Sequence, residues 1–267
     1  MSGQLRGLYA NVNAREIIRL DVTESTNSIA LELGKKGAVS GTVVVAGAQT
    51  SGRGRLNRPW LSLPGMGLYF SVVLRPRLAP ENLPKVTLAA GLALCKAVEA
   101  AYSLSPEIKW PNDLLLDGRK FGGILTETEF VAGSDSSQST LVVIGVGLNL
   151  VHPEGGYPAD IEERATALSL HAVRQIPSEI LLETCVAAVE KEVQRLEKGD
   201  FPVILKEWLQ RDAIQGKILT WVTPQSKLVT GVSLGPDADG VLLIRDEAGT
   251  IHTVLSGDVN LVGKIPE

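Results

Sequence analysis

The sequence is poor in the residues that bind transition metals and form disulfides. Its 267 residues include only two cysteines and three histidines. Cys95 and Cys185 lie far apart, each in a helix-like run, which indicates two buried thiols and no disulfide framework. The histidines are scattered, so they form no zinc-ligand spacing with the cysteines. We therefore expect no structural or catalytic transition metal.

The sequence also lacks the long apolar run, of about 18 residues or more, that a membrane-spanning helix needs. Residues 1–16 are polar and contain no hydrophobic region of a signal peptide. We therefore expect a cytoplasmic protein without a membrane segment. With 44% hydrophobic and 21% charged residues, the composition is that of an ordinary globular protein. The chain is long enough for one large domain or two smaller ones.

Charge is unevenly distributed along the chain, whose net charge is −4. Between Ser25 and Leu78 there are seven basic residues and a single acidic one, Glu32. The overall acidity argues against a general nucleic-acid binder. A basic segment in an acidic protein instead suggests a small polyanion, such as a nucleotide, as the ligand.

Hydrophobic periodicity predicts an α+β protein whose pattern changes near residue 213. Strands are expected at residues 16–22, 43–48, 67–74, 107–109, 114–116, 120–127 and 140–149. Helices are expected within 80–102, at 178–198 and near 201–210, and a further helix is expected to follow an N-cap among residues 23–27 and to end near residues 35–36. Short alternating strands, typical of a small β-barrel, follow at residues 217–223, 228–234, 241–245 and 252–256. We therefore divide the chain into a loose N-terminus (1–15), a large domain (16–213) and a C-terminal domain (214–267).

The segment from Gln49 to Trp60 carries three arginines and two glycines but no acidic residue, and predicted strands flank it. Glycine lets backbone N–H groups approach an anion, and guanidinium groups bind phosphate oxygens bidentately. Arginine and glycine are also common in ordinary solvated loops. This segment alone therefore leaves an anion site and a plain surface loop equally open.

Other motifs place polar residues and glycines at the ends of predicted strands or within them. Ser25-Thr26-Asn27 lies at a strand-to-helix turn, where we expect at least one of the three to cap the helix. In Lys109-Trp-Pro-Asn-Asp113 the proline forbids helix at the tryptophan. Asp117-Gly118 predicts a type I′ hairpin. Gly122-Gly123 indicates a close approach by another chain segment or by a ligand, and Asn149 ends a buried strand.

Five motifs together resemble those of bacterial biotin protein ligases and occur in the same order. They are Ser25-Thr-Asn27, Gln49-Thr-Ser-Gly-Arg-Gly-Arg55, Lys109-Trp-Pro-Asn-Asp113, Gly118-Arg-Lys-Phe-Gly-Gly-Ile124 and Gly145-Val-Gly-Leu-Asn149. The resemblance extends from about residue 16 to the end of the chain. It implies an α+β catalytic domain similar to class II aminoacyl-tRNA synthetases, followed by an SH3-like domain. Many members carry an N-terminal helix-turn-helix, for which residues 1–15 are too short; we therefore expect a ligase that does not bind DNA.

The resemblance implies that ATP activates biotin to biotinyl-5′-AMP and that biotin then passes to a lysine of a biotin carboxyl carrier domain. Biotin's carboxylate is already ionised, so the first step needs positioning and charge neutralisation and no general base. The implied catalytic residues are Lys120, Arg53 and Asp113. Lys120 would stabilise charge on the reacting carboxylate and phosphate, and Arg53 would lie near the phosphate. Asp113 would orient or deprotonate the incoming lysine, although it could also be a structural carboxylate after Pro111.

The resemblance also implies residues that bind the two substrates. Those for biotin are Ser25, Thr26, Asn27, Gln49, Arg53, Gly54, Arg55, Lys120 and Gly123. Those for ATP are Arg55, Trp60, Lys109, Asn112 and Asn149, although Trp60 fits a packing role in the loop better. Asn112 and Asp113 are the implied ligands of Mg²⁺ or its waters, because hard oxygen ligands suit that ion.

Two alternatives remain open. A lipoate or octanoate ligase of the related fold would need a longer, more apolar slot, and a non-catalytic biotin sensor would not need Lys120, Arg53 and Asp113. Family members often dimerise through sheet edges of the catalytic domain, so we expect a homodimer. The sequence departs from the family pattern after Arg55, where some relatives have another glycine and more basic residues. Pro59 predicts a stiffer second half of this loop.

Overall fold

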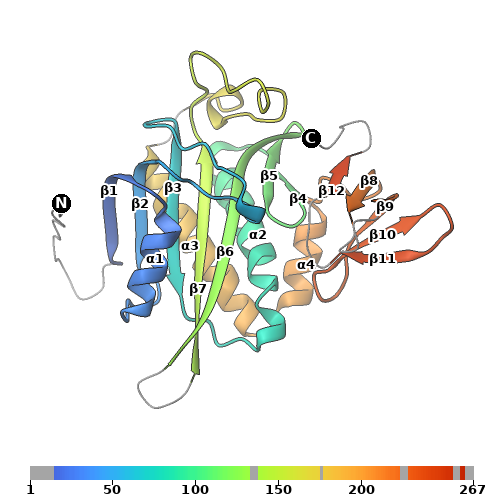
Figure 1. Cartoon of the computed structure of the whole chain (residues 1–267), viewed down its shortest axis with the longest axis horizontal. Coiled ribbons are helices and arrows are strands. Elements are labelled where there is room, and N and C mark those ends of the chain that lie inside the picture. Colours follow the sequence, from blue (N-terminus) through green and yellow to red (C-terminus); the bar gives the residue numbers. More distant parts are fainter. Residues whose placement is uncertain (1–14, 133–137, 175–176, 223–227, 255–258, 262–267) are drawn as a thin grey trace.

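The structure, a computed structural model, describes residues 15–132, 138–174, 177–222, 228–254 and 259–261. A seven-stranded sheet with strand order β1-β2-β3-β7-β6-β5-β4 forms the centre of the large domain (Figure 1). Its strands are β1 (Ile17–Thr23), β2 (Val43–Gln49), β3 (Gly67–Leu74), β4 (Glu107–Lys109), β5 (Asp113–Leu116), β6 (Arg119–Ala132) and β7 (Gln138–Asn149). β1 and β2 run parallel, and the other neighbours in the sheet run antiparallel.

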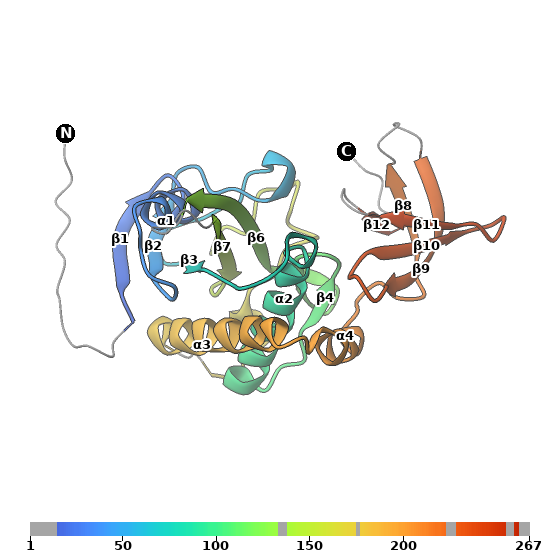
Figure 2. The same ribbon diagram turned by 90° about the horizontal axis from the view of Figure 1, so that it is seen from below.

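Helices cover the two faces of this sheet unequally. α2 (Lys85–Tyr102), α3 (Ser178–Glu197) and α4 (Phe201–Leu209) lie on one side, over the main hydrophobic core (Figure 2). The shorter α1 (Thr26–Lys35) lies on the other side, over a small core that includes Ala30, Val44 and Val143. Beside α1, the segment between β2 and β3 crosses in front of β7 and β6 (Figure 1). This second face is where the predicted site residues meet.

Small residues lie side by side on that face because of the strand register. Gly147 of β7 pairs with Gly123 of β6, and Gly145 pairs with Ser71 of β3 on its other side. We call Gly123, Gly145 and Gly147 the glycine floor. β3 itself is buried along nearly its whole length, because helices or loops cover both of its faces.

The C-terminal domain is a five-stranded antiparallel sheet with strand order β11-β10-β9-β8-β12. Its strands are β8 (Ile218–Val222), β9 (Leu228–Pro236), β10 (Leu242–Asp246), β11 (Ile251–Val254) and β12 (Val259–Leu261). The domain lies beyond the β4 edge of the large sheet, next to α4 (Figures 1 and 2). Trp110 Nε1 donates to Gly240 O at 3.0 Å, and Lys85 Nζ lies 3.2 Å from Asp239 Oδ1. Apolar residues of both sheets belong to one continuous core.

The predicted elements agree with the observed ones to within a few residues at their ends, and the α+β fold is confirmed. The hairpin at Asp117-Gly118 is confirmed by φ angles of 50° and 72°, the left-handed values that a type I′ turn requires. β12 was not predicted. Residues 1–14, 223, 255–256 and 262–267, to which predictions were also attached, lie outside the described residues. None of the described helices has the length and apolar character needed to cross a membrane.

Both cysteines are buried and unpaired with each other, as predicted. Burial raises the pKa of the Cys95 thiol and of the Cys185 thiol to about 12, because a thiolate would lose its hydration there. Both thiols are therefore core residues that stay protonated and are poor nucleophiles.

Candidate active site

The arginine-rich segment folds as a short hairpin across the sheet. Gly54 N donates to Arg58 O at 2.7 Å, and Trp60 N donates to Gly52 O at 2.8 Å. Leu56 and Asn57 at its tip have φ angles of 54° and 58°, in the left-handed region that non-glycine residues seldom adopt. The hairpin therefore has a defined shape.

Trp60 lies against the glycine floor. A Cβ at Gly147 would approach Trp60 Nε1 to 2.4 Å, and one at Gly123 would lie 3.2 Å from Trp60 Cζ3. The close approach predicted at Gly122-Gly123 is thus made, at Gly123, by the indole. Lys120 Nζ lies 5.2 Å from the centre of the Trp60 ring, within the range of a cation–π interaction. The buried Trp60 Nε1 has no hydrogen-bond partner among the described residues.

A polar network forms one wall beside the floor. Gln49 Oε1 accepts hydrogen bonds from Thr26 N at 2.9 Å and from Thr26 Oγ1 at 3.2 Å, while Gln49 Nε2 donates to Ser62 Oγ at 2.9 Å. Thr26 is 4% exposed. The structure thus brings together Thr26 and Gln49, which are 23 residues apart in sequence.

The prediction that Ser25, Thr26 or Asn27 caps α1 with its side chain is wrong. Ser25 occupies the N-cap position, but its side chain makes no capping hydrogen bond. Gln49, from the end of β2, accepts from the first N–H of the helix instead. The parallel pairing of β1 and β2 places Gln49 opposite Thr23, close to the start of α1. Gln49 can therefore cap the helix in place of Ser25, Thr26 or Asn27.

Asn27 and Arg53 meet at Glu127, a residue outside the predicted site. Asn27 Nδ2 donates to Leu125 O at 3.1 Å and to Glu127 Oε2 at 2.7 Å. Arg53 Nη2 lies 3.1 Å and 3.2 Å from the two carboxylate oxygens of Glu127. The sequence offered one signal for Glu127, which is an acidic residue four positions after Gly123 on a predicted strand. Without the fold, nothing paired it with Asn27.

Lys120 and Asp113 form an ion pair at the other end of the floor. Lys120 Nζ lies 2.5 Å from Asp113 Oδ1, and both side chains are partly exposed. The backbone of Lys120 is anchored as well, because Lys120 N donates to Arg164 O and Lys120 O accepts from Thr166 N. Asp113 is thus engaged with the predicted catalytic lysine, and Lys109 lies opposite it in the β4–β5 register.

Two asparagines border the same region. Asn112 Oδ1 accepts from Arg55 Nη1 at 3.3 Å, and Asn112 Nδ2 donates to Ile124 O at 2.8 Å. Asn149 Nδ2 donates to Thr166 O at 3.0 Å. Arg55 and Asn112 were both predicted to contact ATP, and the structure joins them directly.

Comparison with known proteins agrees with this arrangement. The model of the biotin/lipoate A/B protein ligase family matches residues 20–149. The chain is 34% identical to the bifunctional ligase/repressor BirA of Bacillus spizizenii, over 96% of this chain and 77% of the relative. It is 31% identical to the biotin–[acetyl-CoA-carboxylase] ligase of Paracoccus denitrificans, over 85% of this chain and 93% of the relative. The chain belongs to the biotin protein ligase family.

Solved biotin protein ligases have the same fold. The ligase from Aquifex aeolicus in complex with biotin and ATP superposes with a TM-score of 0.76 at 30% identity, covering 93% of this chain and 99% of that one. This likeness includes the five-stranded C-terminal sheet, so the expected combination of a ligase catalytic domain and a small SH3-like domain is confirmed.

The predicted Mg²⁺ ligands of this biotin protein ligase fit an ion that arrives with phosphates. Asn112 and Asp113 each already use one oxygen, in contacts with Arg55 and Lys120. The described residues contain no group of three or more His, Cys, Asp or Glu that could hold a metal alone. Mg²⁺ that is bound to substrate phosphates needs only a few protein ligands, such as one carboxylate and one amide, because phosphate oxygens and waters complete its coordination shell.

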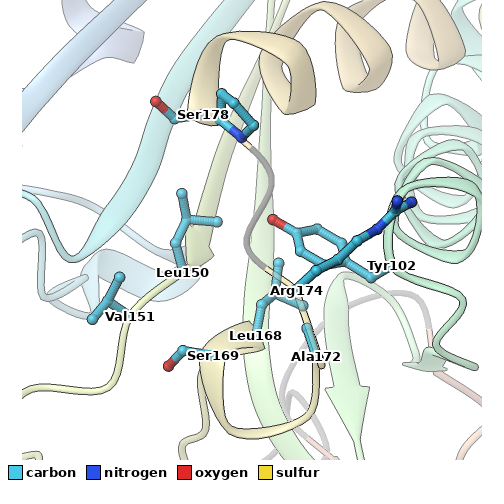
Figure 3. Close-up of a pocket in the computed structure, with 9 residues that line it drawn as sticks. Tyr102, Leu150, Val151, Leu168, Ser169, Ala172, Arg174 and Ser178 are labelled. Atoms are coloured by element: carbon cyan, nitrogen blue, oxygen red, sulfur yellow. The ribbon is translucent and has the colours of Figure 1, made fainter.

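A cavity of about 360 Å³ has a different set of lining residues (Figure 3). It is lined by residues that follow β7 and by the start of α3, among them Leu150, Val151, Leu168 and Ser178. None of the predicted site residues of the ligase lines it. We place the site where the charged and polar groups of the predicted motifs converge, because adenylate formation requires neutralisation of phosphate charge.

Proposed function

We propose that this protein activates biotin with ATP and transfers it to a lysine of a biotin carboxyl carrier domain. The observation that carries the proposal is the position of the Lys120–Asp113 pair. The pair lies at the glycine floor beneath Trp60, and the basic hairpin that carries Arg53 and Arg55 crosses the same floor. Membership of the biotin protein ligase family supports the same reaction.

In the first step an oxygen of the biotin carboxylate attacks the α-phosphorus of ATP. A bond forms between these atoms, the bond to the bridging oxygen breaks, and pyrophosphate leaves. Both reactants are anions, so the chain's contribution is to hold them together and neutralise charge. Lys120 is the cation best placed for this task, with Arg53 and Arg55 on the hairpin. Asn112 and Asp113 would hold Mg²⁺, which when bound neutralises further phosphate charge.

In the second step the acceptor lysine attacks the acyl carbon of biotinyl-5′-AMP, and AMP leaves. The lysine must lose a proton to become a nucleophile. Asp113 is the carboxylate next to Lys120, and we assign it the role of orienting the incoming ammonium group and receiving its proton. An amide bond and AMP are the products.

The polar wall supports biotin over a fatty acyl substrate. Gln49, Thr26 and Ser62 form a hydrogen-bonded network, whereas a lipoyl or octanoyl chain offers no groups to pair with it. A hydrocarbon chain can make no hydrogen bonds with these side chains, so the wall would not help to orient it. A ureido ring, which both donates and accepts hydrogen bonds, suits this wall. Ser25 and Asn27 remain predicted contacts of the same ring.

Further assignments stay predictions. For the nucleotide they are Lys109, Asn112 and Asn149, with Trp60 closing the loop. For the molecule they are a homodimer, a cytoplasmic location and the absence of DNA binding. The domain boundary near residue 213 is also a prediction.

Transfer to a carrier domain tests the proposal as a whole. The protein is incubated with biotin, ATP, Mg²⁺ and the purified carrier domain of an acetyl-CoA carboxylase, and the acceptor is analysed by intact mass. We expect one biotin on one lysine, and none when that lysine is replaced by arginine. An acceptor that stays unmodified while the protein is folded and binds biotin would contradict the proposal.

A further inference from the structure

We propose that Glu127 is a positioning residue that orients Asn27 on the wall of the site and Arg53 on the hairpin through one carboxylate. The inference rests on the proposed function, since it concerns how the same site is held ready. Glu127 lies in β6, opposite Val143 of β7, and its side chain is 26% exposed. It is therefore shielded on one side and open towards the hairpin on the other.

The buried side of this carboxylate fixes the amide of Asn27, which is 3% exposed. One Nδ2 hydrogen goes to Leu125 O and the other to Glu127 Oε2, while Oδ1 accepts from Ser71 Oγ at 2.6 Å. A Cβ at Gly145 would come within 2.0 Å of Asn27 Oδ1, so the floor has room for the amide only because Gly145 has no side chain. Without Glu127, a buried N–H would lose its acceptor.

The open side of the carboxylate fixes the guanidinium of Arg53. Arg53 Nη2 contacts both Glu127 oxygens, and it also lies 3.5 Å from Ser28 Oγ. The backbone of Arg53 is already held, because it pairs with Pro59 across the hairpin. An ion pair this exposed adds little to folding stability. The ion pair instead holds the long, flexible side chain of Arg53 in one orientation, where it would otherwise sample many.

The two roles separate in two substitutions. Gln at position 127 keeps an oxygen for Asn27 Nδ2 but removes the charge that holds Arg53. Ala removes both contacts. The chain supplies a matched control in Glu129, two residues further on the same strand and facing the same side, which pairs with Lys35 at 2.8 Å. Glu129→Gln removes an equivalent ion pair that touches neither Asn27 nor Arg53.

The experiment measures biotin-dependent ATP–pyrophosphate exchange by the three variants as functions of biotin concentration. For Glu127→Gln we expect kcat to fall about tenfold, because Arg53 is no longer aligned, and KM for biotin to stay within about twofold. For Glu127→Ala we expect the same fall in kcat and in addition a rise of about tenfold in KM for biotin, from the unpaired amide. Glu129→Gln should match the wild type within about twofold in both constants.

Three results would overturn the proposal. The first is that both Glu127 variants have the same kcat and KM as Glu129→Gln. The second is that Glu127→Gln exchanges faster than the wild type. The third is that Glu127→Gln and Glu127→Ala change KM for biotin equally. Faster exchange would mean that Glu127 restrains Arg53 by competing with phosphate. Equal changes would mean that Gln does not preserve the Asn27 contact and that the split between the two roles does not exist.

A second measurement needs no catalysis, so it separates this proposal from the proposed function. Trypsin cleaves after arginine, and the Arg53–Gly54 bond lies in the hairpin. We expect Glu127→Gln to increase cleavage at this bond at least about threefold, because the free side chain enters the protease more readily, and Glu129→Gln to leave it unchanged. Equal cleavage in both variants would contradict the positioning role. A wild-type protein without exchange activity would contradict the proposed function alone.

Discussion

Lys120 is held at the glycine floor from several directions. Its backbone pairs with Arg164 and Thr166, its ammonium contacts Asp113, and the Trp60 ring lies next to it. A lysine side chain normally has many rotamers, and the contacts of its ammonium with Asp113 and Trp60 reduce their number. The charge is therefore preorganised for an anion, which is the arrangement that electrostatic catalysis requires.

Replacing Lys120 by Ala should abolish most adenylate formation and leave biotin binding nearly intact. We expect pyrophosphate exchange to fall by about 10²–10³, because the charge acts mainly on the reacting carboxylate and phosphate. Biotin affinity, measured by calorimetry, should change by less than about tenfold. Lys35→Ala, which removes an exposed lysine paired with Glu129, is the control and should behave as wild type. Unchanged exchange by a folded Lys120→Ala variant would remove Lys120 from the mechanism.

At the scale of residues, the sequence motifs named most of the side chains that the structure brings together, but not their pairings. The roles of Lys120, Asp113, Arg53 and Gln49 were implied by motifs that resemble those of biotin protein ligases. Glu127 stands in a strand, and its importance depends on two residues about 75 and 100 positions away that reach it only in the folded sheet. Gln49 as the cap of α1 is similar, since the rule for capping considers only neighbours in sequence.

At the scale of elements, the site is built by a hairpin lying on a strand. The segment between β2 and β3 places Trp60 on β7 and β6, and Gly147 is the contact with the least room. β7 was predicted correctly from its apolar run. The close approach was predicted at Gly122-Gly123 of β6, and Gly147 of β7 contacts the same indole as Gly123. That the approaching group is an indole from the same chain could not be predicted, because the direction of the hairpin depends on tertiary contacts.

Gly147→Ala should displace Trp60 and with it the hairpin. The added Cβ would come 2.4 Å from Trp60 Nε1, too close for any real contact, so the indole must move. We expect a loss of stability of about 1–3 kcal/mol and a shift in tryptophan fluorescence, together with a fall in exchange activity. Gly155→Ala is the control, since a Cβ there meets nothing within 4 Å. A Gly147→Ala variant with wild-type fluorescence and activity would contradict the packing described here.

At the scale of the whole molecule, the two domains are joined by paired backbone and a shared core. Ile108 of β4 accepts from Ala213 N at 2.9 Å and donates to Arg211 O at 2.7 Å, so the connection to the C-terminal domain continues the large sheet. The change of hydrophobic pattern near residue 213 indicated two domains. It gave no sign of how tightly they are joined, because Trp110–Gly240 and Lys85–Asp239 link residues more than a hundred positions apart.

Asp212 makes this junction sensitive to pH. Burial raises the pKa of Asp212 to about 6, despite hydrogen bonds from Ile214 N and Gln215 N. Its Oδ2 has no hydrogen-bond partner in the part of the chain that the structure describes. Since this pKa exceeds the ordinary value of 3.8, the folded protein holds the proton more tightly than the unfolded chain does. The stabilisation is complete below pH 3.8 and is lost as the pH rises through about 6.

Asp212→Asn should therefore remove the fall in the free energy of unfolding that the ionisation of Asp212 causes as the pH rises. In urea unfolding between pH 4 and 8, we expect the wild type to lose up to about 3 kcal/mol from this group and the variant to lose correspondingly less. At pH 8 the variant should be the more stable protein. Asp21→Asn, at an exposed position of β1, is the control. An Asp212→Asn variant that is less stable than wild type at pH 8 would show that the charged carboxylate is favourable at the junction.

The most direct test of the central claim is ATP–pyrophosphate exchange by the purified protein, with biotin, lipoate and octanoate supplied separately. Exchange reports adenylate formation without requiring an acceptor, so it tests the site by itself. We expect exchange with biotin and none above background with the other two acids. Exchange with lipoate or octanoate but not biotin would contradict the role given to the polar wall. Biotin binding without exchange would identify a sensor and contradict the roles given to Lys120 and Asp113.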